Sequence, residues 1–465
     1  MTNEQSKKQK KQGGGAPASG VNKSKTPQII PPDAHSISLD SVNESAVQVA
    51  AKLASAGFEA YLVGGCVRDL LLGTQPKDFD LATDARPEEI KQVFRSCRLI
   101  GRRFRLAHVR FGREIIEVAT FRAGLDDDME SEADEDDRRV SAAGQVMRDN
   151  VYGSKEDDVV RRDFRVNALY YDPVNQTVID YVNGMDDLRN GVLRTIGDPM
   201  ERFREDPVRM LRAVRFSAKL GFKIDAKAQA ATGELASLLH HVPPARMYDE
   251  VLKLFHGGHA LETFNHLREH GLFRYLFPFT EQCLDGLVPN LPSLALRNTD
   301  RRIKEGKPVI PAFLFASMLW DPVRTDAEKL IDHGQTAARA WETATSDAIR
   351  DQAQHVAIPR RLAIVIKDIW GLQSKLEQRP PRMIARLMQH ERFRAAYDFL
   401  MLRAEVEEVE RKLAEWWTEI QEADAERQQR MISTLAPRSQ KNRRRRRRKN
   451  PAEKNHANRM SKIPV

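Results

Sequence analysis

The stretch YLVGGCVRDLLLGTQPKDFDLAT occupies residues 61–83, and its order of residue types decides how this part of the chain folds. A short apolar run meets a glycine pair, a helical stretch follows, and two aspartates then stand two residues apart. Gly64 and Gly65 let the backbone turn and approach a ligand closely. The N-terminus of the following helix offers unpaired N–H groups to an anion. If Asp78 and Asp80 lie in a strand, their side chains point to one face.

This segment combines a loop that could bind phosphate with two carboxylates that could bind a metal ion. Two carboxylates on one face can hold Mg²⁺, which favours oxygen ligands and keeps substrate phosphates in its shell. Each motif by itself is weak evidence for function, since a glycine pair is most often only a turn and a lone Asp-x-Asp is most often a solvated loop. Their adjacency strengthens the joint interpretation, with Arg68-Asp69 and Lys77-Asp78 in between. Transfer of a nucleotidyl group needs both features together.

The composition is ordinary for a large protein that folds in water. At 465 residues the chain has room for roughly three domains, and 41% hydrophobic residues can fill their cores. No apolar run approaches the ~20 residues of a membrane span, and the N-terminus lacks the apolar stretch of a secretory signal. Cys66, Cys97 and Cys283 are too few and too scattered for a disulfide framework or a zinc cluster. A cytoplasmic location is therefore expected.

Charge is distributed unevenly along the chain. The formal net charge is +9 and the isoelectric point is near 9.3, which suggests a polyanionic partner. Residues 126–137 are mostly acidic, whereas residues 443–448 are unbroken arginine followed by Lys449. An arginine run can be a solubilising tail, but it also neutralises phosphates without reading sequence. We expect these six arginines to bind RNA: Arg443, Arg444, Arg445, Arg446, Arg447 and Arg448.

The residue pattern predicts an α+β fold, with a small mixed-sheet domain followed by an all-helical remainder and disordered ends. In the first domain the expected helices are Ser45–Ala56, Val67–Leu72, Arg86–Phe94 and Arg161–Tyr171, and the expected strands are Ala60–Val63, Asp78–Ala82, Leu106–Phe111, Ile115–Thr120 and Val178–Tyr181. Residues 126–144 look like a mobile surface insertion. Further helical series run through Met210–Leu220, Leu252–Phe264, Val309–Leu319 and Leu362–Leu372, then through a helix opened by Pro380 and Pro381 and a last one carrying Trp416 and Trp417. The expected divisions are 1–43 (disordered), 44–182, 183–245, 246–435 and 436–465 (disordered tail).

A third carboxylate is expected beside Asp78 and Asp80, because two-metal phosphoryl chemistry clamps both the attacking and the leaving oxygen. Glu117 lies on the expected strand Ile115–Thr120, where glutamate is disfavoured unless it faces water or a metal. The alternative is an edge-strand glutamate that faces solvent. The residues leave these two interpretations at about even odds.

The run Arg161-Arg162-Asp163 opens the next cluster. Its two arginines could form a capping pair on a solvated face, or they could hold triphosphate oxygens, for which arginine is well suited. Asp163 could accept from a ribose hydroxyl or join the metal site. Asn167 stands four residues later, on the same face if the segment is helical.

The run Glu205-Asp206-Pro207-Val208-Arg209 is the third cluster. Asp206 before Pro207 suits the start of a helix, so a capped amphipathic helix explains part of the pattern. It does not require Arg209, Arg212 and Arg215 near one face. Asp206 and Arg209 could instead hydrogen-bond the Watson–Crick edge of an incoming base, as a protein substitute for a template.

The run 101–109 places Arg102, Arg103 and Arg105 around Phe104, ahead of a strand. Arginines around an aromatic ring suit stacking on bases with contact to phosphates, and a solvated basic loop is about as good an explanation. His108 by itself is more typical of a structural histidine than of a catalytic one.

Taken together, these motifs resemble the class II nucleotidyltransferases of the DNA polymerase beta superfamily, which include the CCA-adding enzymes and the bacterial poly(A) polymerases. The resemblance covers about residues 45–430, and the sequence of 99–109 is similar to the poly(A) polymerase branch. It implies head (44–182), neck (183–245), body (246–435) and tail regions, Mg²⁺ as cofactor, and ATP as the preferred nucleotide. The long acidic insertion is a departure from the family pattern and could repel RNA from one face of the head.

The expected reaction is template-independent addition of AMP to RNA 3′ ends, with the RNA hydroxyl attacking the α-phosphorus of ATP and pyrophosphate leaving. Asp78 and Asp80 would hold the metals, with Glu117 or Asp163 as the third active-site carboxylate. The expected nucleotide-binding residues are Gly64, Gly65, Arg68, Arg161, Arg162, Asn167, Glu205, Asp206 and Arg209. A CCA-adding tRNA enzyme is the nearest alternative, and an RNA-binding protein on an inactive scaffold is a more distant one. Proteins of RNA decay or RNA chaperoning are the expected protein partners.

Overall fold

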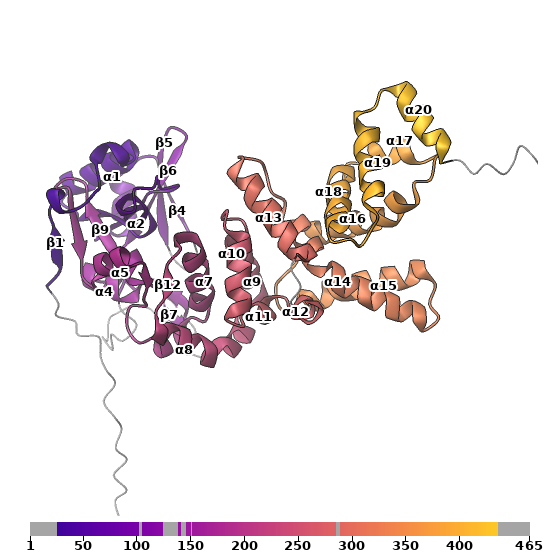
Figure 1. The fold of residues 1–465 in the computed structure, drawn as a ribbon. Coiled ribbons are helices and arrows are strands. Elements are labelled where there is room, and N and C mark those ends of the chain that lie inside the picture. The colour runs from indigo at the N-terminus through magenta and orange to yellow at the C-terminus, as the bar shows by residue number, and fades with distance from the viewer. Residues whose placement is uncertain are drawn as a thin grey trace, which may run out of the picture. The chain divides into compact units, whose positions relative to one another are not determined.

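The computed structural model describes residues 26–101, 105–123, 138–140, 146–149, 151–284 and 289–435. The chain divides into two compact units, Met1–Val242 with Asn265–Tyr275 and Pro243–Phe264 with Leu276–Val465. The first holds the sheet and the second is helical (Figure 1). Within the described parts of the chain, no helix is both long and apolar enough to cross a membrane.

An eight-stranded mixed sheet organises the first unit (Figure 1). Its spatial order is β1-β10-β9-β2-β3-β6-β5-β4. The strands are β1 Gln28–Ile30, β2 Ala60–Val63, β3 Asp80–Thr83, β4 Cys97–Ile100, β5 Leu106–Phe111, β6 Glu114–Thr120, β9 Leu169–Asp172 and β10 Thr177–Asp180. β3 and β6 run parallel, and the other neighbours in this sheet are antiparallel. The parallel pair sets the first residue of β3, Asp80, opposite Glu117 in the middle of β6.

Helices and short strands complete this unit. Its helices are α1 Glu44–Ser55, α2 Gly65–Leu71, α3 Pro87–Val93, α4 Lys155–Arg161, α5 Gly184–Asn190, α6 Pro199–Glu205, α7 Val208–Leu220 and α8 Ala226–Leu235, with parts of α10 Ala260–Glu269 and α11 Phe273–Leu276. Two small sheets pair β7 Arg138–Val140 with β8 Val146–Asp149 and β11 Val192–Leu193 with β12 Lys223–Ile224. α1 shows how sequence sets such an element, since Asn43 caps it and its apolar residues at helical spacing are buried: Ala46, Val49, Ala50 and Leu53.

Most predicted elements of this unit are confirmed to within a residue or two, but two predictions are wrong. The helix predicted over Arg161–Tyr171 is instead the end of α4, a 3₁₀ turn at Arg165–Asn167 and strand β9. Its last residues are fully buried in the middle of the sheet, where aromatic side chains favour a strand. The strand predicted over Asp78–Ala82 is confirmed at Asp80–Thr83, so Asp78 lies just before it. Within the segment 1–43 predicted to be disordered, Gln28–Ile30 pairs with β10 as an edge strand.

The second unit is built from helices. They are α9 Pro244–Phe255, α12 Pro278–Cys283, α13 Leu291–Lys304, α14 Pro311–Asp332, α15 Ala337–Gln352, α16 Arg360–Gln378, α17 Ile384–Met388, α18 Phe393–Glu405, α19 Arg411–Glu422 and α20 Ala425–Thr434. The helix predicted over Leu252–Phe264 is broken, because α9 ends at Phe255 ahead of Gly258, whose φ is +85°. The single helix predicted after Pro381 is two helices, α17 and α18.

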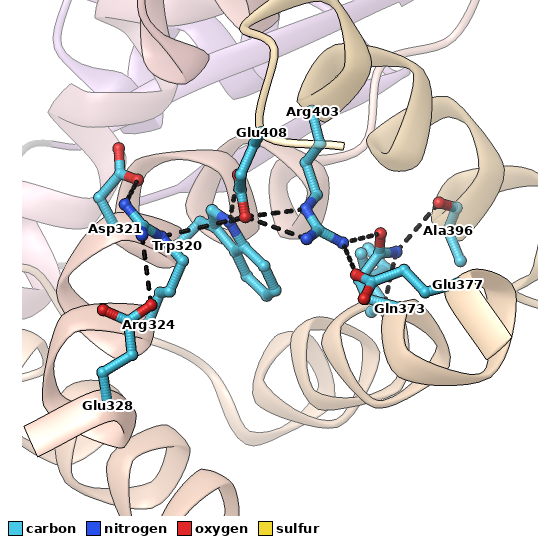
Figure 2. Close-up of polar contacts among 10 residues, drawn as sticks. Trp320, Asp321, Arg324, Glu328, Gln373, Glu377, Ala396, Arg403 and Glu408 are labelled. Atoms are coloured by element: carbon cyan, nitrogen blue, oxygen red, sulfur yellow. Dashed lines mark hydrogen bonds and ion pairs between the residues drawn. The ribbon is translucent and has the colours of Figure 1, made fainter. Parts of the chain in front are cut away.

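A buried guanidinium joins three helices of this unit (Figure 2). Arg403 of α18 is 5% exposed and donates to the carboxylates of Glu408 at 3.0 Å and Glu377 at 2.6 Å, and to the Gln373 side-chain oxygen at 3.1 Å. The Trp320 indole N–H of α14 donates to the same Glu408 carboxylate at 2.9 Å. Removing the guanidinium would destabilise the fold, because it leaves the buried side-chain oxygen of Gln373 without its donor.

Candidate active site

The glycine loop lies between strand β2 and helix α2. Gly64 has φ 75° and ψ −127°, a conformation that an L-residue rarely adopts, and α2 begins at Gly65. A Cβ added at Gly64 would lie 3.4 Å from Nη1 of Arg162. The turn therefore requires glycine at position 64 for its backbone angles, and it places the loop against the Arg162 guanidinium.

Three carboxylates gather where β3 begins. Asp78 and Asp80 are exposed on either side of the buried Phe79, and the charge of Asp78 acts on Asp80. Glu117 lies directly opposite Asp80 on the parallel strand β6. Asp80 keeps an exposed surface, yet desolvation, followed by the charges of Glu117 and Asp78, raises its pKa to about 6. This concentration of like charge is what a bound cation would relieve.

Asp163 is held by protein donors instead. It is buried, and its Oδ2 accepts from Nε and Nη2 of Arg212 at 2.8 and 2.5 Å. Its Oδ1 accepts from the Phe164 N–H at 2.8 Å and from Nδ2 of Asn167 at 3.1 Å. Burial by itself would raise the pKa of Asp163, but the Arg212 guanidinium and the Asn167 amide lower it to about 2. Both oxygens therefore have protein partners, whereas the carboxylates that act on Asp80 are Asp78 and Glu117.

Arg68 begins a polar chain that reaches from α2 to α7. It is 2% exposed, and its Nη1 donates to Oδ1 of Asn167 at 2.5 Å while its Nε donates to Asp69 at 2.8 Å. The other oxygen of Asp69 accepts from Lys219 of α7 at 2.9 Å. The structure thus places Arg68 and Asn167, both predicted to bind the nucleotide, in a buried network. Sequence reasoning assigned no role to Asp69 or Lys219, which are 150 residues apart.

Arg162 connects the glycine loop with the carboxylates. Its Nη2 and Nε donate to Asp158 at 2.8 and 3.1 Å, and Nε also lies 3.1 Å from the Tyr170 hydroxyl. Its positive charge lowers the pKa of Asp80. Arg162 is therefore anchored by residues that the sequence did not single out, and its remaining amino group, Nη1, faces Gly64.

The run 205–209 joins α6 to α7. Oε2 of Glu205 accepts from Nη1 of Arg202 at 2.6 Å and from Nη1 of Arg209 at 2.7 Å. Arg202, which the sequence did not single out, donates from Nη2 to the carbonyls of Arg161 and Arg162 at 2.8 and 2.9 Å. Asp206 ends α6, and its Oδ1 accepts from the Val208 N–H at 3.2 Å. Glu205 thus holds two arginines, and the predicted second and third clusters meet at Arg202.

The predicted RNA-contacting arginines fall only partly within the described residues. Arg105 is about half exposed and forms an ion pair with Glu88 at 2.9 Å. Arg102 and Arg103 lie outside the described residues, as do Arg443–Arg448 and the acidic insertion 126–137. Their predicted roles therefore stay predictions.

Comparison with family models finds three matches along this chain. Residues 60–194 match the "Poly A polymerase head domain". Residues 221–284 match the "Probable RNA and SrmB- binding site of polymerase A", and residues 333–451 match the "Polymerase A arginine-rich C-terminus". The active-site residues described above fall in the first match and in the segment between the first two matches, residues 195–220.

Comparison with individual proteins indicates the same family as the family models. Poly(A) polymerase I of Salmonella typhi is 47% identical over 431 residues, which cover 89% of this chain and 91% of that protein. A CCA-adding enzyme of Lactobacillus helveticus is 38% identical over 219 residues, 47% of this chain and 51% of its own. The solved CCA-adding enzyme of Bacillus stearothermophilus with CTP has a TM-score of 0.52 at 24% identity and covers 84% of this chain and 81% of its own, a likeness of fold.

Proposed function

This chain belongs to the bacterial poly(A) polymerase family, and we propose that its glycine loop and strand-end carboxylates transfer AMP from ATP to RNA 3′ ends. The observation that carries the proposal is the grouping of Asp78, Asp80 and Glu117 beside Gly64 and Arg162. The chain is a polynucleotide adenylyltransferase by family, and the CCA-adding enzymes are more distant relatives.

The carboxylates fit a divalent cation such as Mg²⁺. The pKa of Asp80 is raised to about 6 by desolvation and by the charges of Glu117 and Asp78, although the Arg162 charge acts in the opposite direction. Among the described residues, no three His, Cys, Asp or Glu side chains form a ready-made metal cage. Mg²⁺ does not need one, because it is commonly bound by one or two carboxylates together with water and substrate phosphates. When bound, the ion would supply positive charge at the phosphates and make the 3′ hydroxyl more acidic.

The residues of this chain would then act mainly by positioning, as is general for phosphoryl transfer. Asp78 and Asp80 hold the cation, and Glu117 is the third carboxylate. Gly64 and Gly65 leave room for the triphosphate next to Nη1 of Arg162. Arg68 and Asn167 act indirectly, because Arg68 donates to Asn167 and the Asn167 amide in turn donates to Asp163.

Selection of the nucleotide would fall to the start of α7. Glu205 holds the guanidinium of Arg209 in one orientation through a 2.7 Å contact. A preoriented guanidinium presents a fixed fork of donors, and with Asp206 it could pair with the edge of an adenine. The arginine tail and Arg105 would contact the RNA backbone without reading its sequence. Protein partners from RNA decay or RNA chaperoning remain part of this proposal.

Incubation with non-tRNA RNA and each nucleotide separately tests the function. Long A-tails that need a divalent cation are the expected product. Addition that stops after three nucleotides on tRNA would favour CCA synthesis instead. Asp78→Ala is expected to abolish AMP incorporation while RNA binding, measured by filter retention, stays near that of the wild type. Substantial residual polymerisation by Asp78→Ala would refute the metal assignment.

A further inference from the structure

A row of polar residues crosses the sheet from the carboxylate cluster. β3, β6, β5 and β4 are successive neighbours. Their register sets Asp80 opposite Glu117, Glu117 opposite His108, and His108 opposite Arg98. Residues that stand opposite each other on neighbouring strands carry their side chains on the same face. His108 therefore lies on the face that carries the carboxylates, one strand beyond Glu117.

His108 and Glu117 are in direct contact. Nε2 of His108 lies 3.1 Å from Oε1 of Glu117. Because an ionised carboxylate can only accept, the proton of this hydrogen bond must be on Nε2. The two side chains are 23% and 46% exposed, and pairs that are this accessible contribute little to stability. The contact does, however, restrict the direction in which the Glu117 carboxylate points.

We propose that His108 is a positioning residue for the transfer reaction, whose Nε2–H holds Glu117 toward the cation bound beside Asp80. This inference rests on the proposed function, since it needs Glu117 to share the cation with Asp78 and Asp80. Hydrogen bonds to ligating groups fix their orientation, and their loss typically lowers metal affinity by about 10–100-fold. The exposed position of the pair places His108 toward the lower end of that range.

Mn²⁺ binding to the full-length protein without nucleotide tests the proposal, with free Mn²⁺ measured by electron paramagnetic resonance. His108→Ala is expected to weaken Mn²⁺ binding by roughly tenfold and to raise the Mg²⁺ concentration for half-maximal AMP incorporation by a similar factor. His108→Gln keeps an N–H donor near the position of Nε2, so its affinity should stay within about threefold of the wild type. Arg110→Ala is the matched control on the same strand and face, two residues away, and should change neither quantity.

Two outcomes would overturn the proposal. One is wild-type Mn²⁺ affinity in His108→Ala, and the other is a loss in His108→Gln as large as in His108→Ala. If His108→Ala does not fold, His108→Asn takes its place, because its shorter side chain cannot bring a donor to Glu117. Failure of the proposed function is a separate result, in which the wild type itself incorporates no AMP with any RNA and Mg²⁺.

Discussion

Asp163→Asn and Asp80→Asn each remove one negative charge, and they are expected to change stability in opposite directions. The pKa of Asp163 falls from its ordinary 3.8 to about 2 because of Arg212 and Asn167, despite burial. Each tenfold change in proton affinity is worth about 1.4 kcal/mol, so the charged form of Asp163 stabilises the fold by about 2 kcal/mol at pH 7. That contribution is fully present above about pH 4 and is lost as the pH falls through about 2.

The charge of Asp80 has the opposite effect on the stability of the fold. Its folded pKa of about 6 lies above the ordinary 3.8, so without a cation its charge opposes folding at pH 7 and the penalty disappears as the pH falls below about 4. Because the side chain is exposed, solvent screening reduces this penalty to about 1 kcal/mol or less. Asp80→Asn should therefore be slightly more stable than the wild type in EDTA, yet inactive.

Urea denaturation at pH 7 in EDTA measures both effects. Asp163→Asn is expected to lose about 2–3 kcal/mol, since the Arg212 guanidinium is left without its carboxylate. Asp186→Asn, which removes an exposed carboxylate of α5, is the control and should stay within about 0.5 kcal/mol. In the activity assay, Asp163→Asn should lower turnover while the half-maximal Mg²⁺ concentration stays unchanged. Wild-type stability together with a large increase in the Mg²⁺ requirement would refute this reasoning and indicate that Asp163 belongs to the metal site.

Four further perturbations have defined outcomes. Since protons compete with Mg²⁺ for Asp80, the half-maximal Mg²⁺ concentration should be constant above about pH 7 and rise by up to about tenfold between about pH 6 and 5; a flat titration would contradict this. Gly64→Ala should cost about 1–3 kcal/mol in unfolding free energy, because φ is 75°, and should raise the KM for ATP. Arg403→Met should cost about 1–3 kcal/mol, because it leaves the buried side-chain oxygen of Gln373 without its donor while Glu408 keeps Trp320 and Arg324 as partners. Arg394→Met, at an exposed pair, should cost less than about 0.5 kcal/mol. Deleting residues 436–465 should weaken RNA binding and flatten its salt dependence, by about 0.7 in the log–log slope for each RNA phosphate that the shortened chain no longer neutralises; an unchanged slope would assign the tail to something other than RNA.

The sequence predicted local elements well where one segment contains all the necessary information. The helix over Ser45–Ala56 and the strands over Leu106–Phe111 and Ile115–Thr120 could be predicted from neighbours a few residues away. Predictions failed where the surroundings decided. Tyr170 and Tyr171 continue a plausible helical pattern, but they are buried in the middle of the sheet, and burial among strands outweighs local preference.

By itself the sequence determined the strand–glycine–helix turn, the pair Asp78 and Asp80, and the family to which these belong, because such features depend on residues close together in the chain. Tertiary structure alone decided which groups surround that pair. Glu117 lies opposite Asp80 because of the parallel register of β3 and β6, and Asp163 accepts hydrogen bonds from Arg212, 49 residues away in the sequence. The physical reason is that strand order and register set which distant side chains share a face, and no local periodicity contains that information.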